Sequence, residues 1–100
     1  MIIHCVFCAM PLGAEARAVM AELEAFALGL PGVLAFDSGP NRDFEAKSPG
    51  FLHGFVIRFA DEAARAAYAE HPTHKALGAR LVALCEGGAD GIMVFDLDVP

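Results

Sequence analysis

The chain has 100 residues, 56% of them hydrophobic, and its thirteen Asp and Glu against seven Lys and Arg give a formal net charge of −6. This length predicts a single domain over residues 1–100. The acidic balance disfavours nucleic acid and anionic membrane surfaces as partners, and no apolar run approaches the roughly 20 residues of a membrane span. Because the first residues lack the features of a signal peptide, we expect a cytoplasmic location.

The first half of the chain predicts two strands around one helix. Residues 1–10 are rich in β-branched and aromatic side chains and predict a strand, and residues 14–30 carry apolar side chains at helical intervals. A Pro-Gly pair ends this helix, and residues 33–37 predict the second strand. Residues 38–50 contain Gly, Pro, Asn and charges, so they predict a long loop.

The second half predicts two more strands around a broken helix. Residues 52–59 alternate in polarity and predict the third strand, and residues 61–69 predict a short helix capped by its initial Asp. His71-Pro72 is expected to break the helix, because proline restricts the residue before it and suits the first turn of a new helix. A Gly-Gly pair ends the new helix, and residues 91–98 predict the fourth strand.

The element order β-α-β-β-α-β predicts an α+β fold of the ferredoxin-like type, a four-stranded antiparallel sheet with the helices on one face. The opposite face is also apolar, since it would carry Ile3, Cys5 and Phe7 from the first strand and Met93, Phe95 and Leu97 from the fourth. A solvated face would be polar at alternate positions. The sequence therefore predicts a homodimer that covers this open face.

Cys5 and Cys8 form a C-x-x-C sequence, a spacing found in redox pairs and in zinc sites. Residues three apart in a strand point to opposite faces, and no second pair is spaced to complete a zinc site. We therefore expect both cysteines, like Cys85, to be small hydrophobic residues.

Four side chains that can exchange protons are expected to face the space between the helices and the sheet: His4, His53, Tyr68 and His74. Val6, Phe55 and Ile57 would line the same ligand pocket. The helix dipole and burial should keep His74 neutral, which suits a general base. Tyr68 would donate a hydrogen bond to the carbonyl oxygen of a substrate that loses a neighbouring proton to His74.

The same histidines have a plainer interpretation as core residues bonded to backbone carbonyls. A metal site of His4, His53 and His74 fits by ligand type, but no carboxylate in the same stripes completes it, so we predict no metal. No glycine-rich nucleotide motif occurs, and no cofactor is predicted. His71 is expected to cap a helix or to lie in solvent.

Six segments spread over nearly the whole chain are shared with one known family: Ile3-His4-Cys5-Val6-Phe7, Leu30-Pro31-Gly32-Val33, Gly39-Pro40-Asn41, His53 before the third strand, His71-Pro72-Thr73-His74 and Val94-Phe95-Asp96. Together they resemble the stress-responsive A/B barrel (Dabb) family. The resemblance implies that two ferredoxin-like sheets pair into a dimeric α/β barrel. One plant branch of the family cyclises polyketides by aldol condensation without a cofactor. Its catalytic residues match Tyr68 and His74, and residues that line its pocket match His4 and His53.

The sequence departs from the family at Cys8-Ala9-Met10, where many members carry a basic residue, and it has alanine at bulky pocket positions along the first helix. We therefore expect a small dimer that binds a small organic ligand, with cofactor-free cyclase- or aldol-type proton transfer as its chemistry. The alternatives are a non-catalytic structural or stress-related homodimer and, ranked lower, a cofactor-free monooxygenase.

Overall fold

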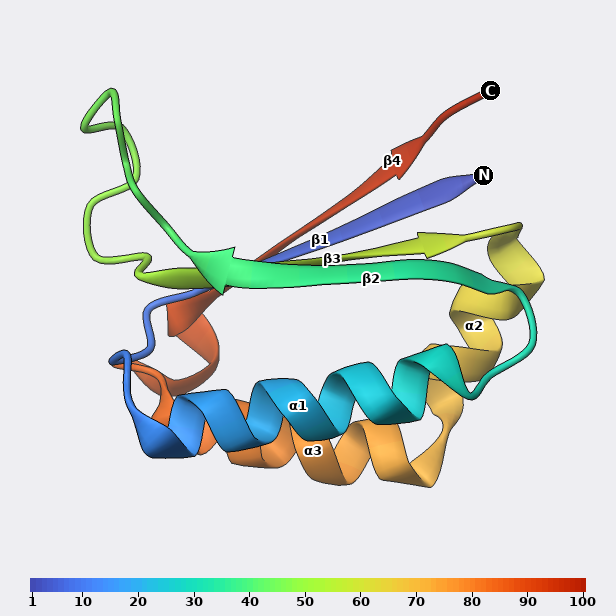
Figure 1. Cartoon of the computed structure of the whole chain (residues 1–100), viewed down its shortest axis with the longest axis horizontal. Coiled ribbons are helices and arrows are strands. Elements are labelled where there is room, and N and C mark those ends of the chain that lie inside the picture. Colours follow the sequence, from blue (N-terminus) through green and yellow to red (C-terminus); the bar gives the residue numbers. More distant parts are fainter.

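The computed structural model describes all residues from 1 to 100. Its elements are β1 (Ile2–Cys8), α1 (Ala14–Leu28), β2 (Val33–Pro40), β3 (His53–Phe59), α2 (Glu62–Glu70), α3 (Pro72–Leu84), the 3-10 helix η1 (Gly88–Gly91) and β4 (Ile92–Asp98). The strands form one antiparallel sheet in the order β2-β3-β1-β4, which confirms the ferredoxin-like prediction. Helices α1 and α3 run side by side under one face, and α2 connects the sheet to α3 (Figure 1). None of these helices combines the length and the apolar character needed to cross a bilayer.

The hydrophobic core lies between the sheet and the helices, as the alternation in β1 and β3 predicts. Val6 of β1 is 4% exposed, and Ile57 and Phe59 of β3 are fully buried. From the other side, α1 contributes a stripe that includes Val19 and Leu23. This stripe recurs every three to four residues, so one face of the helix packs on the sheet and the other stays in water.

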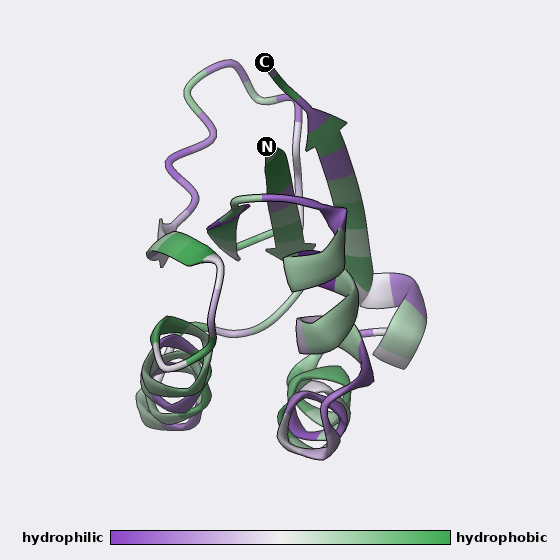
Figure 2. Ribbon diagram, turned by 90° about the vertical axis from the view of Figure 1, so that its right-hand side faces the viewer, coloured by the Kyte–Doolittle hydropathy of each residue, from purple (hydrophilic) through white to green (hydrophobic).

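The opposite face of the sheet is mostly apolar, with Asp37 and Arg58 as exposed charged residues, and no helix covers it. Met93, Phe95 and Leu97 of β4 are 40%, 51% and 52% exposed, and they alternate with Val94 and Asp96, which lie on the helix side but are also exposed at this edge strand. Figure 2 shows the hydrophobic strands with the helices on one side only. We call this surface the open face; it comprises the outward residues of β1, β3 and β4 together with those of β2.

Strand β2 is longer than predicted, because it continues to Pro40 instead of ending at residue 37. Ser38, Gly39 and Pro40 resemble a turn in sequence, yet each pairs with a residue of β3. Proline is tolerated there because β2 is an edge strand, where its missing N–H leaves no ladder bond unmade on the solvent side. The connection to β3 is correspondingly shorter and spans residues 41–52.

This connection, which we call the β2–β3 loop, folds around the carboxylate of Asp43. Oδ1 of Asp43 accepts hydrogen bonds from the backbone N–H of Lys47 and of Ser48 and from the Ser48 hydroxyl, at 2.9, 3.1 and 2.9 Å. These bonds lower the pKa of the Asp43 carboxyl. Within this loop Asp43 and Ala46 have positive φ values of 44° and 54°, which non-glycine residues seldom adopt. The loop stands on the side of the sheet away from the helices (Figure 1).

Two side-chain caps define the broken second helix. Oδ1 of Asp61 accepts from the Ala64 N–H at 2.9 Å at the start of α2, as predicted. His71 ends α2, and its Nδ1 accepts from the Thr73 N–H at 3.0 Å to begin α3. Pro72 occupies the first turn of α3, where its missing N–H is not needed.

The three cysteines are free. Cys5 lies on the open face and Cys8 is fully buried against the helices, so the C-x-x-C residues point to opposite sides as expected. The fold brings Cys85 to Cys8, which the sequence did not indicate. Burial, together with this neighbour, raises the pKa of the Cys8 thiol to about 12.

Candidate functional site

Tyr68 lies between two imidazole rings on the helix-covered side of the sheet. Its ring centroid is 4.4 Å from that of His74 and 5.9 Å from that of His4. The three residues come from α2, α3 and β1, so the cluster exists only in the folded chain. Tyr68 itself is 1% exposed. We call these three residues the Tyr68 cluster.

The first imidazole, His4, is oriented by a carboxylate. Its Nδ1 is 2.6 Å from Oδ1 of Asp96, because the pairing of β1 with β4 places the two residues directly opposite each other. A carboxylate accepts, so Nδ1 of His4 carries the hydrogen and a neutral ring leaves its lone pair on Nε2.

The second imidazole, His74, is oriented by the backbone. Its Nδ1 lies 3.0 Å from the carbonyl oxygen of Ala69, which can only accept, so Nδ1 donates and Nε2 keeps the lone pair. Burial lowers the pKa of His74, partly offset by the Ala69 bond and reinforced by the nearby His4 and Lys75. A lowered pKa keeps the ring neutral at pH 7, as a general base requires.

The phenol of Tyr68 stays protonated at neutral pH, because burial raises its pKa above the ordinary value. Aromatic rings surround it, with the centroids of Phe59 and Phe26 at 5.3 and 5.9 Å. The cluster therefore combines a neutral O–H donor with one imidazole, His74, whose Nε2 can accept a proton, and a second imidazole held by Asp96.

The remaining predicted site residues divide between two places. Val6 and Ile57 are buried under the same face of the sheet, and the Phe55 ring centroid is 6.5 Å from that of His4. His53 lies apart, because it pairs with Cys8, four residues further along β1 than His4 and so roughly 13 Å away at the usual rise of a strand. Burial lowers the pKa of His53, and its Nδ1 has no hydrogen-bond partner.

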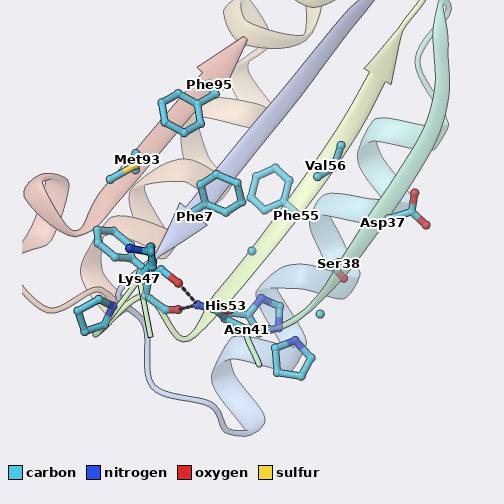
Figure 3. A pocket seen from close by; sticks show the side chains of 16 residues that line it. Phe7, Asp37, Ser38, Asn41, Lys47, His53, Phe55, Val56, Met93 and Phe95 are labelled. Carbon is cyan, nitrogen blue, oxygen red and sulfur yellow. Dashed lines mark hydrogen bonds between the residues drawn. The ribbon is translucent and has the colours of Figure 1, made fainter. Parts of the chain in front are cut away.

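His53 and Phe55 border a different space, a cavity of about 760 Å³ between the open face and the β2–β3 loop (Figure 3). The sequence predicted a pocket on the helix side and gave no sign of this one. Its signal, in hindsight, is the pair of glycines, Gly39 and Gly54, that face each other across β2 and β3.

Asp96 is the functional candidate that sequence reasoning missed. It alternates with the open-face residues of β4 and so faces the helix side, as His4 does in β1. Once β1 and β4 are known to be neighbours, the alternation of side chains along both strands predicts that His4 and Asp96 lie on the same face. No group of three or more His, Cys, Asp or Glu side chains is placed to hold a metal ion.

This arrangement, a four-stranded antiparallel sheet backed by helices with a buried Tyr and His cluster, defines a ferredoxin-like α+β protein. The family model of the stress responsive A/B barrel domain, Dabb, matches residues 2–99, and the chain belongs to this family. No curated protein matches the sequence.

Solved structures agree with this assignment. A dimeric ferredoxin-like protein of unknown function from Jannaschia sp. CCS1 is 46% identical, with 98% of each chain covered and a TM-score of 0.84. A hydroxynitrile lyase from Passiflora edulis is 16% identical, with 99% of this chain and 93% of that one covered and a TM-score of 0.82. A cofactor-independent oxygenase from Streptomyces nogalater is 18% identical, with 98% and 90% covered and a TM-score of 0.72. The lyase and the oxygenase are similar to this chain in fold.

Proposed function

We propose that this protein binds a small organic molecule beside the Tyr68 cluster and moves a proton on it without a cofactor. The observation that carries the proposal is the placement of a neutral phenol between two imidazoles whose Nδ1 atoms are both committed to acceptors. His74 then offers Nε2 for proton transfer. The lyase and the oxygenase share the fold alone, so the proposal depends on the cluster itself.

The proposed step is removal of a proton next to a carbonyl group. Nε2 of His74 takes the proton from carbon, the electron pair of the C–H bond forms a carbon–carbon double bond, and the π pair of the carbonyl moves onto its oxygen to give an enolate. The Tyr68 O–H donates a hydrogen bond to that oxygen, where the negative charge develops. His4, held by Asp96, orients the substrate from the opposite side of the ring. The enolate can then attack a second carbonyl, as in an aldol closure, and the resulting alkoxide takes the proton from His74; alternatively, the enolate carbon recovers that proton.

Deuterium exchange tests this step without knowledge of the natural substrate. In D₂O, the protein is expected to accelerate incorporation of deuterium into the methyl group of acetophenone, followed by NMR. Loss of a general base typically costs about 10²- to 10⁴-fold, so we expect His74→Gln to lose most of the acceleration. Tyr68→Phe should also slow exchange, because the enolate loses its donor.

Arg17→Gln is the control for this experiment, because Arg17 lies exposed on α1 away from the cluster and should leave exchange unchanged. Exchange by the unmodified protein no faster than in buffer would contradict the proposal. If His74→Gln were then also strongly destabilised, the alternative of a structural homodimer, with His74 as a core residue bonded to Ala69, would be preferred.

We further propose that the protein is a homodimer that buries the open face. A row of half-exposed apolar side chains on β4 supports this, since a monomer would leave the row in water. The Jannaschia protein, similar over nearly its full length, is dimeric. An isologous pair of apolar sheet faces is a common solution for such a surface.

Sedimentation equilibrium tests the dimer with a matched pair of variants. Leu97 on the open face and Leu12 before α1 are 52% and 55% exposed, so Leu→Ser removes similar apolar surface at both positions. Leu97→Ser should raise the dimer dissociation constant about tenfold or more, whereas Leu12→Ser should leave it unchanged. A monomeric unmodified protein at tens of micromolar, or equal effects of the two variants, would contradict the proposed interface.

A further inference from the structure

The floor of the open-face cavity is backbone without side chains. Gly39 of β2 and Gly54 of β3 face each other in the sheet, and both are oriented toward the open side. A Cβ built on Gly39 would meet nothing within 4 Å, so the space above it is empty. Gly39 thus leaves a hollow in a surface that a side chain would otherwise fill, whereas the Phe7 ring covers Gly54.

Aromatic and aliphatic side chains wall this hollow. The rings of Phe7 and Phe95 meet edge to face with centroids 6.0 Å apart, and Phe51 of the loop closes the other side. Phe7 lies over Gly54, where a Cβ would come within 3.0 Å of its ring. The cavity, at about 760 Å³, falls within the range of pockets that bind small molecules. Its shape and lining suit a flat apolar body.

Two charged side chains line the cavity, Asp37 and Lys47, and neither takes part in an ion pair within the chain. Asn41 and Ser48 use their side chains within the loop, since Asn41 Nδ2 donates to Ser48 Oγ and Ser48 Oγ donates to Asp43. Figure 3 shows the Asp37 carboxylate turned away from the rings. Lys47 takes part in none of the ion pairs within the chain. Because Asp37 is turned away, Lys47 is the charged group that remains for a ligand between the rings.

We propose that this cavity is a second small-molecule site, separate from the Tyr68 cluster, that takes a flat aromatic carboxylate. The aromatic body would lie over Gly39, beside Phe7, Phe95 and Phe51, and the carboxylate would approach the ammonium group of Lys47. The two sites lie on opposite faces of the sheet. A second copy of the chain packed on the open face would roof the cavity, so a bound carboxylate would also strengthen the dimer by mass action.

Calorimetric titration with 2-naphthoate tests the site. We expect saturable binding to the unmodified protein and at least a tenfold loss of affinity in Gly39→Leu, whose side chain occupies the hollow without a clash. Gly78→Leu places the same side chain on α3, also without a contact within 4 Å, and should bind normally. Gly39→Ala should show a smaller loss. Sedimentation of each variant should give the oligomeric state of the unmodified protein, so that a loss of affinity reports the filled hollow.

His74→Gln separates this proposal from the proposed function, because it should bind 2-naphthoate like the unmodified protein. Absence of binding to the unmodified protein would overturn the proposal and would mean that a partner's side chains fill the cavity. Binding that survives in Gly39→Leu but fails in His74→Gln would also overturn it and would place the ligand at the Tyr68 cluster.

The charge preference has its own test in Lys47→Met. An exposed ion pair contributes up to about 1 kcal/mol, so affinity for 2-naphthoate should fall by up to about fivefold. Affinity for the neutral 2-naphthylmethanol should stay the same. Equal changes for both ligands would overturn the role of Lys47.

Discussion

The two faces of the sheet carry similarly apolar side chains but differ in what covers them. On the helix side, Phe55 is 3% exposed and Phe59 is fully buried, whereas on the open face Phe95 is 51% exposed and Leu97 is 52% exposed. The titratable cluster lies on the covered face and the glycine hollow on the open one. An apolar strand face therefore indicates that the face needs to be buried. Whether the same chain buries it depends on where the helices lie.

The largest expected effect is on the covered face. Phe59→Ala would leave a cavity among fully packed side chains, and such changes cost about 3–5 kcal/mol of the free energy of unfolding. Chemical denaturation at several protein concentrations should show this loss at every concentration. A decrease in the free energy of unfolding of less than about 1 kcal/mol would contradict the proposed difference between the two faces.

The same change on the open face should act through association. Phe95→Ala removes a half-exposed ring, so the extrapolated stability of the monomer should change by less than about 1 kcal/mol. The dimer dissociation constant should rise about tenfold, measured by sedimentation equilibrium. The opposite pattern, a stability loss independent of protein concentration with an unchanged dimer, would show that the open face is packed within one chain.

The sequence predicted which side chains share a face of each helix or strand, because this depends only on the spacing of apolar residues within that element. The stripe of α1 with Val19 and Leu23, the break at His71-Pro72 and the opposite orientations of Cys5 and Cys8 all follow from spacing alone, and the structure confirms them.

What could not be predicted depends on pairing between distant segments. Ser38-Gly39-Pro40 has the composition of a turn, but hydrogen bonding to β3 extends β2 through it. His4 meets Asp96, and His53 lies far from His4, because of strand register, which no local pattern encodes. The roles of the site residues remain predictions that the exchange and binding experiments test.

A smaller effect is expected from the helix that brings Tyr68 to the covered face. Asp61→Ala removes the acceptor for the Ala64 N–H at the start of α2, and loss of such a cap costs about 1 kcal/mol. Thermal unfolding should report it. Asp61→Asn, which keeps an acceptor, should retain most of the stability, and equal losses in the two variants would argue against capping.

The smallest expected effect is a decrease in the free energy of unfolding on acidification, caused by histidines on the covered face. Burial lowers the pKa values of His53 and His74 from 6.5, so between that value and the folded pKa the unfolded chain binds more protons than the folded one. Stability is full above pH 6.5 and falls as pH decreases. Urea unfolding should have a lower midpoint at pH 5.5 than at pH 7.5, with a smaller difference in His74→Gln. A midpoint that rises on acidification would contradict this sign.

The His71-Pro72 break has a geometric consequence for the Tyr68 cluster. At about 100° per residue, two positions six apart on one continuous helix would point about 120° away from each other. Tyr68 and His74 are six apart, yet their rings are in contact, because α2 ends and α3 begins between them. The proline thus acts as a joint that turns two side chains of one chain segment toward each other. Straightening this joint would take the base away from its phenol without altering either residue.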